Sequence, residues 1–265
     1  MLVALAGCGA GSSIATVAGA AHTQAAPARV AAPAAAARTA STSAAASAST
    51  TATTTTPTTT PAPAAPPLAA IEALRPPIHQ WPIPYGARRK REMAEYSLRH
   101  YGEDTYLLRN PKVIVEHYTE TATAQEAYNT FAPDVPDSEF HELPNTCAHF
   151  LVEPSGRIDE LVPLTLRCRH TVGLNWTAFG LEHVGFSDQQ ILEDRAQIRA
   201  SLALTRWLRC RFGLSLRNVI GHNESLSSPY HRERVPAFKH QTHSDWNHAD
   251  MTRYRALLAR LACPR

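Results

Sequence analysis

The first eighty residues of the chain contain no aromatic side chain and no Lys, and they hold no Asp or Glu before Glu72. Ala, Thr, Ser and Pro fill most of this stretch. Such a segment has too little apolar surface to offset the conformational entropy that folding removes. All four Trp, eight Tyr and seven Phe lie after residue 80. The sequence therefore predicts a single folded domain over residues 76–265, preceded by a disordered linker over residues 22–75.

Two further absences narrow the range of functions. Beyond the N-terminal segment there is no unbroken apolar run of about twenty residues, so no other segment is expected to span a bilayer. The sequence His-Glu-x-x-His, which marks a common class of zinc proteases, is also absent. The formal net charge is only +3. A charge this small suits work near an anionic surface and predicts no nucleic-acid partner.

The N-terminal segment indicates export. Residues 1–21 are small and apolar, which is typical of the hydrophobic and cleavage regions of a secretory signal. No basic segment precedes them, so we expect the true start to lie upstream. Leu5-Ala6-Gly7-Cys8 matches a bacterial lipobox, in which Cys8 would carry the lipid anchor. The predicted location is therefore outside the cell, either secreted or attached to the cell envelope as a lipoprotein, and a merely disordered tail is the alternative.

Apolar runs and turn residues predict an α/β domain in residues 76–265. The expected strands are 113–117, 147–152, 158–162, 178–184 and 218–220, and the expected helices are 88–101, 123–131, 187–212 and 250–261. Met93, Tyr96 and Leu98 are the candidates for the buried side of the first helix. In open α/β sheets, ligand sites lie where strands end.

Two histidines and one carboxylate occupy such positions. His117 and His222 each follow a hydrophobic strand closely, and Glu182 lies within another strand. Two imidazoles held at one sheet edge can share a metal, and a zinc hydrolase needs a third protein ligand with one position left open for water. The best source is the polar segment 242–246. With thirteen His in the chain, each histidine taken singly is equally well explained as a structural residue.

Five sequence blocks, taken in order, favour metal-binding over purely structural histidines. They are Val113 to Thr119, Cys147 to Phe150 followed by Gly156, Gly180 to Val184, Gly221 to Glu224, and His243 to Asp245. Their order and approximate spacing resemble the amidase-2 family, which includes zinc N-acetylmuramoyl-L-alanine amidases, phage T7 lysozyme and the peptidoglycan recognition proteins. The resemblance covers residues 78–265. It implies a central mixed β-sheet flanked by helices.

The resemblance also implies roles for individual residues. His117, His222 and Asp245 match the zinc ligands, although the Pro-Gly that usually follows the third ligand is replaced by Trp246. His243 is therefore the rival third ligand. His243 also stands where many members carry a Lys that stabilises the oxyanion, and an imidazole there can be neutral near pH 7.

The remaining roles concern the proton shuttle and the substrate groove. Glu182 aligns with the carboxylate that many bacterial members use as general acid and base. Ala148 replaces a Tyr that other members use in catalysis, which favours Glu182 for this role. His170 lies in a loop that lines the substrate groove, so the resemblance implies a substrate contact, with a structural hydrogen bond as the equal alternative. His149 is expected to be structural.

The cysteines agree with an exported protein. Apart from Cys8, the chain has an even number of Cys, which permits two disulfides. The segments that the resemblance places near one another favour Cys147 with Cys168 and Cys210 with Cys263. Four reduced, buried thiols are the alternative.

The function implied by the resemblance is hydrolysis of the amide between N-acetylmuramic acid and L-alanine in peptidoglycan. Zinc would lower the pKa of a bound water from about 15.7 toward about 7, Glu182 would take its proton, and His243 would stabilise the oxyanion. The expected partner is peptidoglycan. The protein is expected to be a monomer, and its contact with a membrane is expected only through a lipid anchor at Cys8. A peptidoglycan-binding module without activity and a zinc peptidase acting on the stem peptide are the alternatives.

Overall fold

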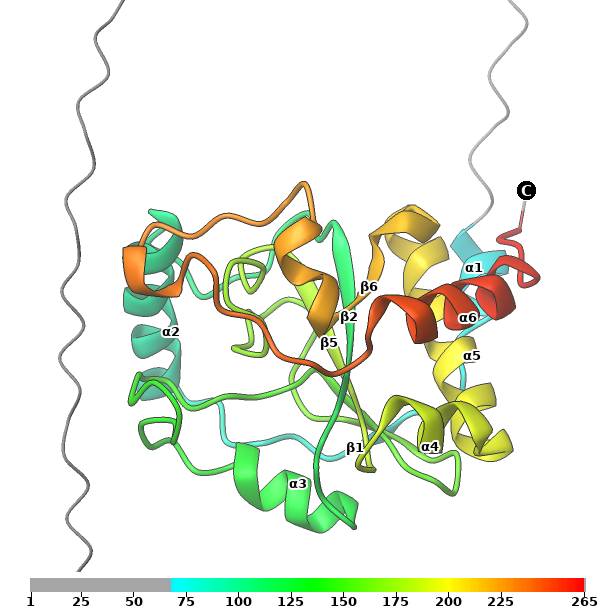
Figure 1. The fold of residues 1–265 in the computed structure, drawn as a ribbon. Coiled ribbons are helices and arrows are strands. Elements are labelled where there is room, and N and C mark those ends of the chain that lie inside the picture. The colour runs from blue at the N-terminus through cyan, green and yellow to red at the C-terminus, as the bar shows by residue number, and fades with distance from the viewer. Residues whose placement is uncertain (1–67, 265) are drawn as a thin grey trace, which may run out of the picture. The chain divides into compact units, whose positions relative to one another are not determined.

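The computed structural model describes residues 68–264 (Figure 1). The expected signal segment, Cys8 and residues 22–67 of the linker lie outside the described residues. Residues 68–72, which the sequence assigned to the linker, form helix α1 (Leu68–Glu72). This helix packs against the later helix α5 (Arg195–Phe212), and Glu72 forms an ion pair with Arg211 of α5. No helix within 68–264 is long and apolar enough to cross a membrane.

A six-stranded mixed sheet forms the centre of the domain. Its strands are β1 (His79–Gln80), β2 (Val113–Tyr118), β3 (Phe150–Val152), β4 (Ile158–Glu160), β5 (Ala178–His183) and β6 (Val219–Gly221). They lie in the order β1-β4-β3-β5-β2-β6, and every neighbouring pair is parallel except the β3–β4 hairpin. The longest strands, β2 and β5, are adjacent and almost fully buried, as expected of parallel strands covered on both faces. The prediction of an α/β domain with a central mixed sheet is confirmed.

Helices cover both faces of this sheet. They are α2 (Ala87–Tyr101), α3 (Ala124–Phe131), α4 (Asp188–Glu193), α5 and α6 (His248–Ala259), with short 3-10 turns η1 (Leu216–Asn218), η2 (His222–Ser227) and η3 (Pro236–Phe238). In Figure 1, α2 lies on one side of the sheet, while α1, α5 and α6 lie on the other. A capping box of Thr123 and Glu126 begins α3, at the start of the helix expected over 123–131.

The prediction of one long helix over 187–212 is wrong, because two helices occupy this range. Asp194 separates them with an extended backbone (φ −75°, ψ 107°). Its carboxylate accepts hydrogen bonds from the backbone N–H groups of Ala196 and Gln197, so it serves as the N-cap of α5. The expected end of the helix at Gly213, in the left-handed conformation, is confirmed.

The expected buried side of α2 is partly wrong. Met93 and Tyr96 are buried, whereas Leu98 is 49% exposed. Arg89 is buried instead, because it lies four residues before Met93 on the same helix face. Its guanidinium donates hydrogen bonds to backbone carbonyls, among them that of Phe131 at 2.8 Å. The helix therefore packs on the face that carries this cation.

Both expected disulfides are present. Cys147 bonds to Cys168, and Cys210 bonds to Cys263. The first joins two segments at the cleft described below, and the second ties the end of α5 to the segment that follows α6.

Strand alternation determines which side chains of β2 and β5 face which helices. His117 on β2 is in register with Glu182 on β5, so the two side chains share one face of the sheet. The neighbouring residues Glu116 and His183 face the other way. There His183 contacts Ser201 of α5, and Glu116 accepts a hydrogen bond from Thr205 of α5. The face with His117 and Glu182 is left to form a site.

Candidate metal centre and cleft

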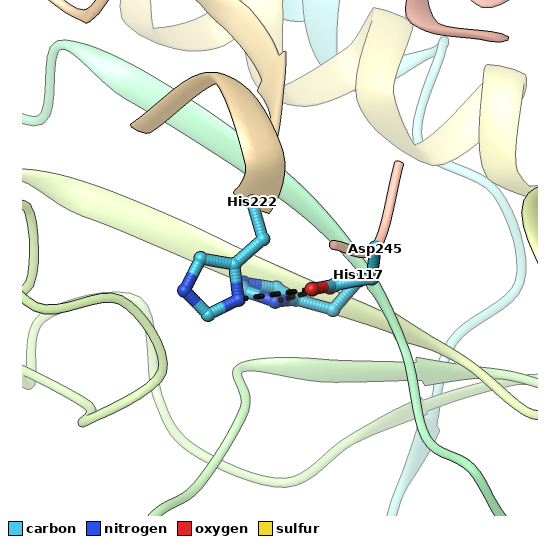
Figure 2. A group of neighbouring side chains, drawn as sticks. All are labelled: His117, His222 and Asp245. Carbon is cyan, nitrogen blue, oxygen red and sulfur yellow. Dashed lines mark hydrogen bonds and ion pairs between the residues drawn. The ribbon is translucent and has the colours of Figure 1, made fainter. Parts of the chain in front are cut away.

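Three buried side chains from distant parts of the chain meet at the sheet edge. His117 lies one residue before the end of β2, His222 begins η2 directly after β6, and Asp245 lies in the loop before α6. The Nδ1 atoms of His117 and His222 lie 3.1 Å and 3.3 Å from the two carboxylate oxygens of Asp245 (Figure 2). One potential ligand atom from each residue lies within 4.8 Å of the others.

Parallel pairing of β2 and β6 brings the histidines together. Glu116 is paired with Gly221, so the next residues, His117 and His222, leave adjacent strands at the same edge. The Asp245 segment is fixed to this edge by two contacts. The Asp245 carbonyl accepts a hydrogen bond from the Asn223 backbone at 3.0 Å, and the Trp246 indole donates to the His117 carbonyl at 3.0 Å.

Two residues that hold the Asp245 segment in place were not expected in this role from the sequence. Asp188, at the start of α4, accepts hydrogen bonds from the backbone N–H groups of Trp246 and Asn247 at 2.7 Å and 2.9 Å. Trp246 is fully buried and has a left-handed backbone (φ +53°). In the sequence, Asp188 is an ordinary first-turn residue of a helix. Nothing in its local sequence indicates a hydrogen bond to Trp246, which lies far along the chain.

Gly221 is required by the close approach of the Trp246 backbone. A Cβ at residue 221 would lie 1.8 Å from the Trp246 carbonyl oxygen. We therefore expect Gly221→Ala to lower the free energy of unfolding by about 2 kcal/mol or more, because the Asp245–Trp246 segment must move. Denaturant unfolding measures this. Gly86→Ala is the matched control, since an added Cβ there meets nothing within 4 Å. Equal stability of the two variants would contradict the close approach.

The donor set fits zinc. Two imidazole nitrogens and one carboxylate oxygen make a typical set of three protein ligands for a catalytic zinc. Burial by itself would raise the pKa of Asp245, but the hydrogen bonds and charges of His117 and His222 lower it well below its usual range. Asp245 is thus an anion between two imidazoles. The outer nitrogen of His222, Nε2, is buried without a hydrogen-bond partner among residues 68–264.

His117 is oriented from behind by two polar side chains. Its Nε2 lies 3.2 Å from His170 Nδ1 and 3.3 Å from Thr171 Oγ1. These contacts turn Nδ1 toward Asp245, which is how outer polar groups commonly orient metal-binding histidines. His170 also lines the cleft, so both of its expected roles remain compatible with its position. Gly180 makes room for it, because a Cβ there would lie 2.5 Å from the His170 ring.

Glu182 lies beside the three residues on the neighbouring strand. It is only 8% exposed, and its Oε2 has no hydrogen-bond partner in the described part of the chain. Burial raises the pKa of Glu182 from 4.5 to about 7, although the charge of His117 acts in the opposite direction. A carboxyl with this pKa can both take and give a proton near neutral pH.

A cleft of about 270 Å³ opens onto this group. Its walls come from the ends of β2 and β5, from the segments 130–147 and 169–175, and from 241–245. His149 does not line it. That residue accepts a hydrogen bond from the Gly180 backbone at 3.0 Å and lies 3.1 Å from the Leu166 carbonyl, as a structural histidine does. Ala148 is likewise buried in the core.

His243 lies at the cleft but outside the group of three. Its ring stacks on His222 with 4.7 Å between the ring centroids, and its Nε2 lies 3.1 Å from Glu139 Oε2. Both side chains of this pair are about half exposed. The structure therefore brings Asp245, and not His243, between His117 and His222.

Comparison with known proteins agrees with this geometry. The Amidase_2 family, described as N-acetylmuramoyl-L-alanine amidase, matches residues 107–245, a range that contains all three grouped residues and Glu182. No curated protein matches the chain in sequence.

Several solved structures are similar to parts of the chain. The endolysin N-acetylmuramoyl-L-alanine amidase LysCS from Clostridium intestinale URNW is 20% identical, with 56% of this chain and 82% of that chain covered and a TM-score of 0.39. The N-acetylmuramyl-L-alanine amidase AmiD from E. coli, in complex with the substrate anhydro-N-acetylmuramic acid-L-Ala-D-gamma-Glu-L-Lys, is 22% identical, with 44% and 49% covered and a TM-score of 0.35. An AmpD derivative is 18% identical, with 67% and 93% covered and a TM-score of 0.42. The family match spans more than half of the chain, so the protein belongs to the N-acetylmuramoyl-L-alanine amidase family, which hydrolyses the amide between N-acetylmuramic acid and L-alanine in peptidoglycan.

Proposed function

We propose that the protein performs this hydrolysis with a zinc ion held by His117, His222 and Asp245. The observation that carries the proposal is the meeting of two imidazole nitrogens and a carboxylate within 4.8 Å at the floor of a cleft. Zinc held there would act as a Lewis acid and would lower the pKa of water at its open position. Zinc content of the purified protein, measured before and after chelation, tests this proposal together with activity. Full activity in zinc-free protein would contradict it.

Glu182 is the residue that we propose to move the proton. It shares a sheet face with His117 through the β2–β5 register, and its free Oε2 faces no protein partner among residues 68–264. As a carboxylate it accepts a proton from the attacking water. It then delivers that proton to the departing amine of L-alanine, which cannot leave as an anion.

If Glu182 moves the proton, kcat/KM should fall on the acid side of its pH profile. Glu182 works as a base in its ionised form, so activity falls as the pH falls through its pKa. Burial raises this pKa from 4.5 to about 7, and the positive charge of bound zinc lowers it again. We expect the midpoint of this fall between these values. Zinc content is measured at each pH, since acid also releases the metal. A fall that persists unchanged in Glu182→Gln would rule out this assignment.

His243 is the proposed donor to the oxyanion. Its ring lies against His222 at the cleft, and it is held by an exposed pair with Glu139. Pairs of this kind contribute little stability, so the ring can leave Glu139 for the substrate at small cost. A donor that faces the developing oxyanion stabilises the transition state more than the bound substrate.

We also propose that the substrate is intact cell wall reached by export. The signal-like residues 1–21, the Ala/Thr/Pro-rich linker and the two disulfides support this. Fractionation of cells that produce the full chain tests it, and the variant Cys8→Ala separates lipid anchoring from free secretion. Activity confined to the cytoplasm would contradict export.

A further inference from the structure

Phe186 is an exposed aromatic residue close to the cleft. It follows Gly185 just after β5, and its side chain is 55% exposed. The other large apolar side chains that are exposed in residues 68–264 are aliphatic. An exposed aromatic side chain beside a functional cleft is a candidate for ligand contact.

The backbone around Phe186 is tied to both sides of the site. On one side, the Gly185 carbonyl accepts a hydrogen bond from the Glu120 backbone at 3.0 Å, and the Gly185 N–H donates to Thr119 Oγ1 at 3.4 Å. Thr119 and Glu120 line the cleft. On the other side, Asp188 holds the backbone next to the ligand Asp245. Phe186 therefore lies in a segment that is bonded directly to residues that line the cleft.

This segment is also locally fixed. The Phe186 N–H donates to Gln190 Oε1 at 3.0 Å, and Ser187 Oγ accepts from the Gln190 N–H at 3.2 Å as the N-cap of α4. The exposure of the aromatic ring is thus a property of an ordered turn at the start of a helix.

Glu120, whose backbone is bonded to the residue before Phe186, is a polar residue of the same region. It is exposed and lines the cleft, and its backbone takes the left-handed conformation (φ +54°), which residues other than glycine adopt rarely. Unusual backbone of this kind is concentrated at functional sites. A carboxylate and an exposed aromatic ring on adjoining backbone segments offer hydrogen-bond acceptors for hydroxyl groups and an apolar surface.

The covalent structure of peptidoglycan indicates which part of the substrate Phe186 and Glu120 would contact. The stem peptide branches from the sugar strand, so it can enter a cleft enclosed by loops, whereas the strand continues on both sides of the reacting sugar and must cross an open surface. A pyranose ring presents an apolar C–H face and a rim of hydroxyls. We infer that Phe186 and Glu120 form a subsite for the sugar adjacent to the reacting N-acetylmuramic acid. This inference rests on the proposed function.

The test compares substrates with and without neighbouring sugars, using the full chain. Phe186→Ala is assayed on uncrosslinked glycan strands that carry stem peptides and on N-acetylmuramoyl-L-alanyl-D-isoglutamine, which has a single sugar. We expect kcat/KM on the strands to fall roughly three- to tenfold, mainly through KM, with no change on the single-sugar compound. Leu98→Ala, at a similarly exposed position on α2, should change neither. An equal loss on both substrates, or no loss on the strands, would overturn the subsite.

A binding measurement separates this inference from the amidase activity. Glycan strands stripped of their stem peptides are titrated against the wild-type chain, Phe186→Ala and Phe186→Trp, with thermal unfolding as a check on folding. The subsite predicts weaker binding by Phe186→Ala and retained binding by Phe186→Trp. If the chain cleaves nothing, the proposed function fails while this titration still decides on the subsite. Equal binding by all three proteins would refute it.

Discussion

Replacing Glu182 with Gln is expected to lower kcat by about 10²- to 10⁴-fold while zinc content stays unchanged. Gln keeps the size and the hydrogen-bonding atoms of the side chain but cannot accept a proton near neutral pH. Glu182 is buried, and no other carboxylate is in register with His117 on the neighbouring strand. Steady-state kinetics on peptidoglycan and zinc analysis of the same preparation measure the two quantities.

Glu116→Gln is the matched control for this experiment. Glu116 is also fully buried, and burial also raises its pKa from 4.5 to about 7. It lies on the opposite face of the sheet, where it accepts a hydrogen bond from Thr205 at 2.9 Å, a bond that Gln can keep. We expect this variant to retain most of the wild-type kcat. If both variants lose activity to the same extent, the effect reflects the fold and not a proton shuttle.

Asp245→Ala is expected to weaken zinc binding by more than about 10²-fold and to abolish activity at limiting zinc. Changes to outer groups around a metal site cost about 10- to 100-fold, and loss of a direct ligand should cost more. The change also removes the anion between His117 and His222. Titration of the metal-free protein with zinc, followed by a competing chelator dye, gives the affinity.

His243→Ala distinguishes the two candidates for the third ligand. His243 stacks on His222 but is not one of the three grouped residues. We expect its removal to lower kcat and to leave one zinc per chain at nearly the wild-type affinity. The reverse pattern, zinc loss in His243→Ala and zinc retention in Asp245→Ala, would show that His243 is the ligand.

Sequence analysis located five of the six strands and two of the three grouped residues because that information is local, whereas the two-residue strand β1 (His79–Gln80) was missed. Val113–Ile114–Val115 and Val219–Ile220 are β-branched runs, and a parallel sheet places the residues that follow them at one edge. The third residue carried no such signal. Asp245 lies in a loop without periodicity, so its assignment depended on the family resemblance.

Other features depend on contacts between distant residues. Asp188 holds the backbone of Trp246, 58 residues away, and neither position has a local pattern that indicates the other. The prediction that Leu98 lies on the buried face of α2 was wrong because it used apolar character alone. The buried face instead includes Arg89, a cation whose N–H groups donate to backbone carbonyls. His170 was placed at the substrate groove, and its contact with His117 appears only when β2 and the loop before β5 are brought together.

The identity of the bond that is cut tests the account most directly. The full chain is incubated with purified peptidoglycan, with and without a zinc chelator, and the soluble products are analysed by mass spectrometry. The account predicts free stem peptides that begin with L-alanine, released only without the chelator. Cuts within the stem peptide would contradict it in favour of a peptidase, and binding of the wall by the zinc-loaded protein without release of peptides would show a recognition module.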